Sequence, residues 1–94
     1  MNVKEAVKKA IEYIADVFES EHPENIGLEE VVLNESKDTW EVTIGFSRPW
    51  DHHPKGGLVT GLQPQNPKRQ YKVVRLDNKT GEIESIKIRE IENA

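Results

Sequence analysis

Residues 39–46 decide the fold, and they read Thr-Trp-Glu-Val-Thr-Ile-Gly-Phe. Large apolar side chains occupy every second position of this stretch, namely Trp40, Val42, Ile44 and Phe46. Because successive side chains of a β-strand point to opposite faces, this alternation predicts a strand that is buried on one face. A buried face requires a second apolar surface to cover it, which the rest of the chain has to supply.

The N-terminal segment can supply that surface. Its apolar residues recur at spacings of three and four positions: Val3, Ala6, Val7, Ala10, Ile11, Ile14, Val17 and Phe18. This spacing predicts an amphipathic helix with one apolar stripe. Asn2 and Glu5 can form a capping box at its start. Pro23 disfavours helical geometry at His22, so the helix is expected to end near Glu21.

The segment before the central strand, residues 28–35, also has the composition of a strand. Val31, Val32 and Leu33 are consecutive, so the alternation slips, and an edge strand or a β-bulge is expected there. The polar link over residues 35–38 joins this strand to the central strand as a hairpin. We expect Val31 and Leu33 to lie on the sheet face that the helix leaves open.

A second hairpin is predicted near the C-terminus, with strands over residues 70–77 and 83–91. The link between them has turn chemistry, and Gly81 can adopt a positive φ there. We place four side chains beneath the helix: Val74, Leu76, Ile86 and Ile88. Tyr71, Val73 and Ile83 are then expected on the opposite face. The chain is therefore predicted to be a single α+β domain over residues 1–94, in which an N-terminal amphipathic helix packs on a four-stranded antiparallel sheet made of two hairpins.

Composition limits the classes of function. The 94 residues include no cysteine, which excludes disulfides and thiolate metal sites. No apolar run reaches the ~20 residues of a membrane span, so a cytoplasmic protein without membrane contact is expected. The net charge of −4 disfavours generic nucleic-acid binding. Residues 1–54 carry a net charge of −7 and residues 55–94 one of +3, which predicts either cross-strand ion pairs or a basic patch for an acidic partner.

The order of a helix and two hairpins resembles that of small cystatin-like and PepSY-like α+β domains. The stretch from Tyr71 to Ile83, with Asp77 followed by Thr80-Gly81-Glu82 and Ile83, is similar to the ending of a PepSY unit. This resemblance covers about 20 residues closely and implies a binding or inhibitory module rather than an enzyme. A cystatin's Gln-x-Val-x-Gly loop is not reproduced, since Gly57 stands in the position of its Gln and Pro49-Trp50 precedes the loop instead of following it.

The segment over residues 47–69 is a long connection rich in proline and glycine. A connection of this length is usually functional or disordered. We therefore expect this segment to be either a mobile surface loop or a loop that binds a partner. Trp50, flanked by Pro49 and charged residues, is a candidate hot spot, or it could fold back onto the open sheet face. We predict that four residues bind a partner: Arg48, Trp50, Asp51 and Tyr71.

The stretch Asp51-His52-His53 raises the possibility of a metal site. Imidazole and carboxylate groups bind zinc or nickel, but a site needs three or four ligands in a fixed geometry. His52 and His53 are therefore only weak candidate ligands. The sequence contains no nucleophile elbow and no phosphate-binding loop after a strand, so no catalytic residue is assigned.

Two functions are compatible with these features of the sequence. The favoured prediction is a non-catalytic protein-interaction or regulatory module without a cofactor. It would bind a protein partner, or a second copy of the chain, through the open sheet face and the loop over residues 47–69. The alternative is a small ligand- or metal-binding domain that uses the loop over residues 48–57.

Overall fold

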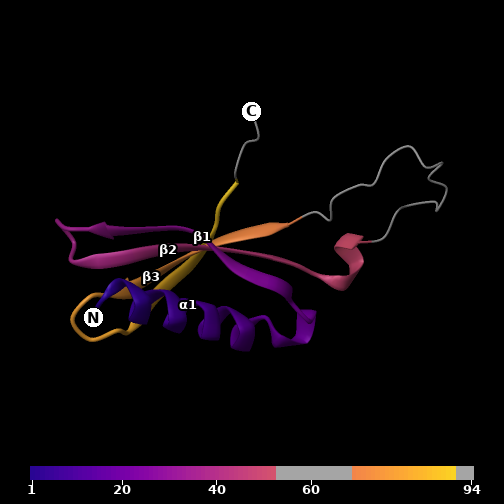
Figure 1. Ribbon diagram of the computed structural model, residues 1–94, viewed down its shortest axis with the longest axis horizontal. Helices are drawn as coiled ribbons and strands as arrows, with labels where there is room; N and C mark the ends of the chain where they lie inside the picture. The colour runs from indigo at the N-terminus through magenta and orange to yellow at the C-terminus, as the bar shows by residue number, and fades with distance from the viewer. Residues whose placement is uncertain (53–68, 91–94) are drawn as a thin grey trace.

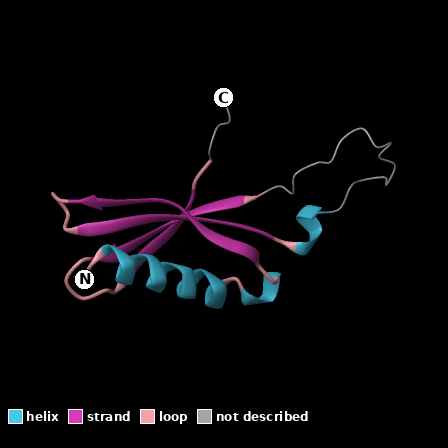
Figure 2. Ribbon diagram, in the orientation of Figure 1, coloured by secondary structure: helices cyan, strands magenta, loops and turns pink. Residues whose placement is uncertain are grey.

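The computed structural model describes residues 1–52 and 69–90. Their elements follow the chain in the order α1 (Val3–Val17), η1 (Glu19–Glu21), β1 (Glu24–Asn34), β2 (Thr39–Ser47), η2 (Pro49–His52), β3 (Gln70–Asp77) and β4 (Ile83–Ile88). The four strands form one antiparallel sheet with the order β1-β2-β3-β4. Helix α1 lies along one side of that sheet (Figures 1 and 2). The predicted α+β architecture is thus confirmed.

Helix α1 begins with the predicted capping box. The side chain of Asn2 accepts a hydrogen bond from the backbone N–H of Glu5, and the Glu5 carboxylate accepts one from the backbone N–H of Asn2. The helix ends at Val17, four residues earlier than expected, and the 3₁₀ turn η1 follows it. His22 then adopts left-handed backbone angles, with φ 52, immediately before Pro23. This left-handed residue reverses the chain into β1.

The core lies between α1 and the central strands. Its fully buried apolar residues are Ala6, Ala10, Ile14, Val42, Ile44, Phe46, Val74 and Leu76. The rings of Phe18 and Phe46 pack 5.3 Å apart between centroids at the C-terminal end of the helix. The two alanines at the centre of the helix stripe let its backbone approach the sheet closely. The central line of the helix stripe and the alternate residues of β2 therefore form one core, as predicted, whereas Val3 and Val17 at the two ends of the stripe remain 43% and 48% exposed.

The strand register corrects three expected side-chain orientations. Val31 pairs with Val42 and Leu33 pairs with Trp40, so both lie on the helix side of the sheet rather than on the open face. Ile83 pairs with Leu76 and packs against the core. The neighbouring Arg75 pairs with Ser85, so Glu84 is an extra residue in β4, and this irregularity moves Ile83 to the helix side. Ile88 pairs with Lys72 on the helix side, as predicted, but it is 76% exposed.

The boundaries of the outer strands also differ from the expectation. Strand β1 is an edge strand with two register irregularities, between Glu24 and Gly27 and between Leu28 and Glu30, and it starts four residues before the predicted position. Strand β4 ends at Ile88, and the predicted strand end at Ile91 lies outside the described residues. Within the described ranges, no helix is both long enough and apolar enough to cross a membrane.

The turn between β3 and β4 is joined to the start of the helix. The amino group of Met1 donates a hydrogen bond of 2.9 Å to the backbone carbonyl of Asn78, and the N-terminus lies beside this turn (Figure 1). The side chain of Asn78 accepts from Trp40 Nε1 at 2.8 Å and donates to Asp38 Oδ1 at 2.9 Å. Asn78 therefore ties together both hairpin turns and the indole of Trp40.

Candidate functional site: an apolar groove beside the edge strand

An open groove of about 610 Å³ runs between α1 and β1. Its walls are apolar side chains from the flank of the helix and from the edge strand, namely Val3, Val7, Ile11 and Leu28. Lys4, Lys8 and Glu12 line its rim. We call this feature the α1–β1 groove. Val3 and Leu28 are 43% and 45% exposed, so a substantial apolar surface remains in contact with water.

The helix sequence explains why this groove stays open. The residues directly over the sheet are Ala6, Ala10 and Ile14, which are fully buried. Val3, Val7 and Ile11 follow one another at intervals of four residues and therefore lie along the neighbouring helix face. The apolar arc of α1 is therefore wider than the surface that this sheet can cover.

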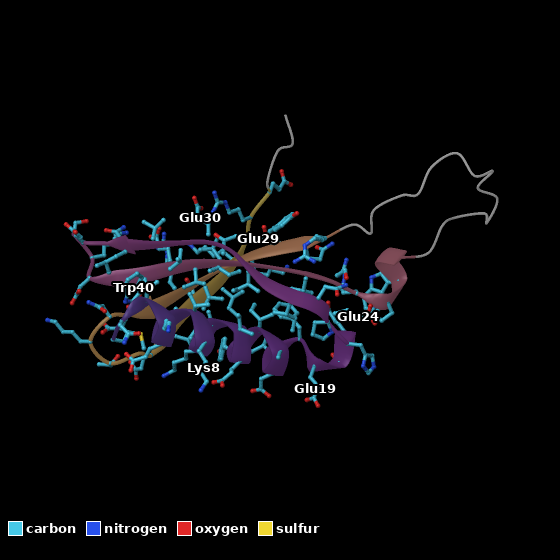
Figure 3. The ribbon with its side chains drawn as sticks, viewed as in Figure 1. Lys8, Glu19, Glu24, Glu29, Glu30 and Trp40 are labelled. Atoms are coloured by element: carbon cyan, nitrogen blue, oxygen red, sulfur yellow. The ribbon has the colours of Figure 1, made fainter. Side chains whose placement is uncertain are left out.

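Two lysines stand at the rim without a partner. Among the residues that the structure describes, neither Lys4 nor Lys8 forms an ion pair within 4.0 Å. They are four residues apart on one helix face, where like charges repel each other. Lys4 also lies in the first turn of α1, where the helix dipole disfavours cations. Figure 3 shows Lys8 on the outer side of the helix. An anionic group at the rim would relieve both unfavourable interactions.

The edge strand β1 provides the second wall of the groove. In the described part of the chain, β1 pairs with β2 alone, so its outer edge has no strand partner. Leu28 pairs with Ile44, which places the Leu28 side chain on the helix side of the sheet. The apolar wall and an unpaired strand edge are therefore adjacent.

The opposite face of the sheet carries several ion pairs beside the apolar side chains of Val32, Tyr71 and Val73. Arg75 Nη2 lies 3.3 Å from Glu41 Oε2, which joins β3 to β2. Arg89 forms an ion pair with Glu30 and donates a 2.7 Å hydrogen bond to Thr43 Oγ1. Glu29 and Glu30 project from β1 on the side away from α1 (Figure 3). The acidic first hairpin and the basic second hairpin thus neutralise each other across the sheet, which confirms the first of the two readings of the charge pattern.

Gly45 forms the floor of a third ion pair on this face. Arg69 Nη2 lies 3.3 Å from Glu29 Oε2 and also donates to the carbonyl of Asn25. A Cβ atom at residue 45 would lie 2.7 Å from that carboxylate oxygen and 2.8 Å from the guanidinium. A side chain at residue 45 would therefore occupy the space of the ion pair. The absence of a side chain at Gly45 makes room for this charge contact.

The residues predicted to bind a partner occupy two separate parts of the fold. Arg48 and Trp50 lie at the end of β2 and in η2, where the guanidinium carbon stands 5.0 Å from the centroid of the indole ring. Arg48 Nη1 also lies 3.5 Å from Glu21 Oε1, and Trp50 is 52% exposed. Asp51 is in η2 as well. Tyr71 pairs with Gly45 on the open face of the sheet.

The candidate metal ligands are only partly placed. His52 lies in η2, whereas His53 falls outside the described residues. Within residues 1–52 and 69–90, no three histidine, aspartate or glutamate side chains are grouped in a way that could hold a metal ion. The metal hypothesis for the loop thus remains a prediction from sequence.

Sequence reasoning did not identify the groove itself. The relevant signal was present in the helix stripe, where the larger residues Val3, Val7 and Ile11 flank a central line of alanines. Whether these flanking residues are covered depends on how far the sheet extends around the helix. That extent depends in turn on the strand order and on the register of β1. A comparison with known protein families, with curated proteins and with solved structures found no match to this chain.

Proposed function

We propose that this protein is a non-catalytic interaction module that binds a partner protein in the α1–β1 groove. The observation that carries the proposal is an apolar groove with two lysines at its rim that have no ion-pair partner among the described residues. Burying apolar side chains against a partner is favourable, and apolar patches with a polar rim are typical of protein contact sites. The resemblance to PepSY-like and cystatin-like domains implies the same class of function.

The groove favours a partner protein over a small polar ligand or a substrate. Its walls are formed almost entirely by carbon atoms of Val3, Val7, Ile11 and Leu28, and the only charged groups are at its edge. A small-molecule site generally has a few polar groups that converge inside the pocket and fix the ligand's orientation. An apolar floor with a charged rim instead corresponds to the anatomy of a protein interface.

Site-specific photo-cross-linking in native lysate tests this proposal. A photoreactive residue at position 8 stands at the rim of the groove, and one at position 16, an exposed site on α1 that does not line the groove, serves as the matched control. We expect a discrete cross-linked protein from position 8 and none from position 16. The capture should decline when Leu28→Thr shortens the apolar wall. Equal capture from both positions, or capture that Leu28→Thr leaves unchanged, would contradict binding in the groove.

A further inference from the structure

We infer that the occupant of the α1–β1 groove is an extended segment of the partner, with apolar side chains at alternate positions and carboxylates beside them, that pairs with β1 as a fifth strand. This inference rests on the proposed function and adds the mode of recognition. Three observations support it: the unpaired edge of β1, the spacing of the apolar side chains on the helix, and the charge of the rim.

The unpaired edge of β1 favours a strand as the occupant. A strand at a sheet edge presents backbone N–H and C=O groups that a second extended segment can bind. The two irregularities of β1 lie between Glu24 and Glu30, and the stretch from Val31 to Asn34 pairs regularly with β2. Bulges of this kind hinder indiscriminate pairing along an edge. A segment that also fills the adjacent groove gains the apolar contacts that a random strand lacks.

The spacing of the helix side chains fits an extended segment. Val3, Val7 and Ile11 are separated by four residues each, which is a rise of about 6 Å per step. Alternate side chains of a strand are about 6.7 Å apart on one face. Over the two steps from Val3 to Ile11 the mismatch is only about 1.5 Å, so three alternate side chains of one strand can each meet one helix residue. The matching stretch of partner is about five residues long.

The rim determines the charge of the segment. Lys4 and Lys8 have no anionic partner in the described part of the chain, and they face one carboxylate, Glu12, along the same rim. Aspartate or glutamate residues that flank the apolar positions would pair with these lysines. They would also speed the encounter, because complementary charge accelerates association.

The test uses the full chain, labelled for NMR, and the designed peptide acetyl-EEVTVTVEE-amide. Two further peptides carry N-methyl groups, either on the three valines or on the two threonines. In a strand, the N–H groups of alternate residues point to the same side, so only one of these two sets can contact β1. We expect one methylated peptide to bind within about threefold of the parent and the other to lose at least about tenfold in affinity.

The charge requirement and the location are tested in the same titration. The peptide acetyl-KKVTVTVKK-amide and the variant Lys4→Glu/Lys8→Glu should each weaken binding by about tenfold. Amide shifts should be concentrated in β1 and α1, with β4 as the unaffected edge. Equal losses from both methylated peptides, shifts centred on β4, or no saturable shift up to about 1 mM would overturn strand addition. If the peptide titration fails but the photoreactive residue at position 8 still captures a partner protein, the groove binds that partner by another mode, and only the inference of strand addition fails. If both experiments fail, the proposed function fails as well.

Discussion

The substitution Asn78→Ala should strongly destabilise the fold, because this side chain links the two hairpin turns. Its amide oxygen accepts from Trp40 Nε1 at 2.8 Å and its amide nitrogen donates to Asp38 Oδ1 at 2.9 Å. The backbone N–H of Asn78, which donates to the Asp38 carbonyl at 2.9 Å, is unaffected by the change. Both of these side-chain hydrogen bonds are therefore lost, together with a longer one of 3.4 Å that the amide oxygen accepts from the Met1 amino group. The indole N–H, in a partly buried position, loses its acceptor.

The magnitude follows mainly from the two shorter bonds, to Trp40 and Asp38. Each contributes roughly 0.5–1.5 kcal/mol, so the free energy of unfolding should fall by about 2 kcal/mol. For a domain of this size, that loss lowers Tm by about 8–16 °C. It also lowers the urea midpoint by about 1–2 M. Urea titration followed by tryptophan fluorescence measures the midpoint, and a thermal melt followed by circular dichroism measures Tm.

Two controls make this prediction specific to the Asn78 side chain. Lys79→Ala removes a neighbouring side chain that is 82% exposed and stands 3.8 Å from Asp38, so it should cost less than about 0.5 kcal/mol. In a Trp40→Phe background, which lacks the indole donor, Asn78→Ala should cost about half as much as in the parent chain. The reasoning is refuted if Asn78→Ala costs less than about 0.5 kcal/mol, or if its cost is the same in both backgrounds.

Three further predictions concern substitutions at Asp77, Gly45 and Trp50. The backbone N–H groups of Thr80 and Lys79 donate to Asp77 Oδ1 and hold its pKa below the usual 3.8. Its stabilising contribution is therefore complete above that value and is lost as the pH falls through the lower pKa of the folded state. When the pH is lowered from about 5 to about 2, the urea midpoint should consequently fall less steeply for Asp77→Asn than for the parent chain. Gly45→Ala should displace the Glu29 carboxylate and the Arg69 guanidinium, and the Tyr71 ring, 3.1 Å from the new Cβ, must shift slightly. We expect a cost of no more than about 1 kcal/mol, because the two closest groups are the ends of flexible side chains; a loss above about 2 kcal/mol in a urea titration would contradict this. Trp50→Ala should change the unfolding free energy by less than about 0.5 kcal/mol, since the ring is half exposed. A fall in partner capture by this variant would therefore establish the hot spot expected from the sequence, and unchanged capture would exclude it.

The open face of the sheet illustrates how charge pattern and register combine. The sequence places acidic residues in the first half of the chain and basic residues in the second, which predicted either pairing across the sheet or a basic patch for an acidic partner. The individual partners, such as Glu41 with Arg75 and Glu30 with Arg89, depend on which residues the register brings opposite each other. The same register moves Val31 and Leu33 to the helix side. The expected apolar contact surface on the open face therefore lacks these two residues.

The site illustrates the limit of local reasoning more clearly. Periodicity identified Val3, Val7 and Ile11 as apolar helix residues, but it assigned them to the core together with Ala6 and Ala10. Whether a residue at the flank of a helix stripe is covered depends on how far the neighbouring strand reaches around the helix. That distance is set by the irregularities of β1, which no periodic pattern encodes.

The sequence by itself determined the helix and its capping box, the four strands in order, the turn at Gly81 and the central apolar face of β2. These features depend on side-chain spacing and on the conformational preferences of neighbouring residues, which act over a few positions of the chain. The tertiary structure alone decided the parity of the outer strands, the ion-pair partners and the groove beside Leu28. Each of these arises where residues distant in sequence meet, and a shift of one position in strand register moves a side chain to the opposite face.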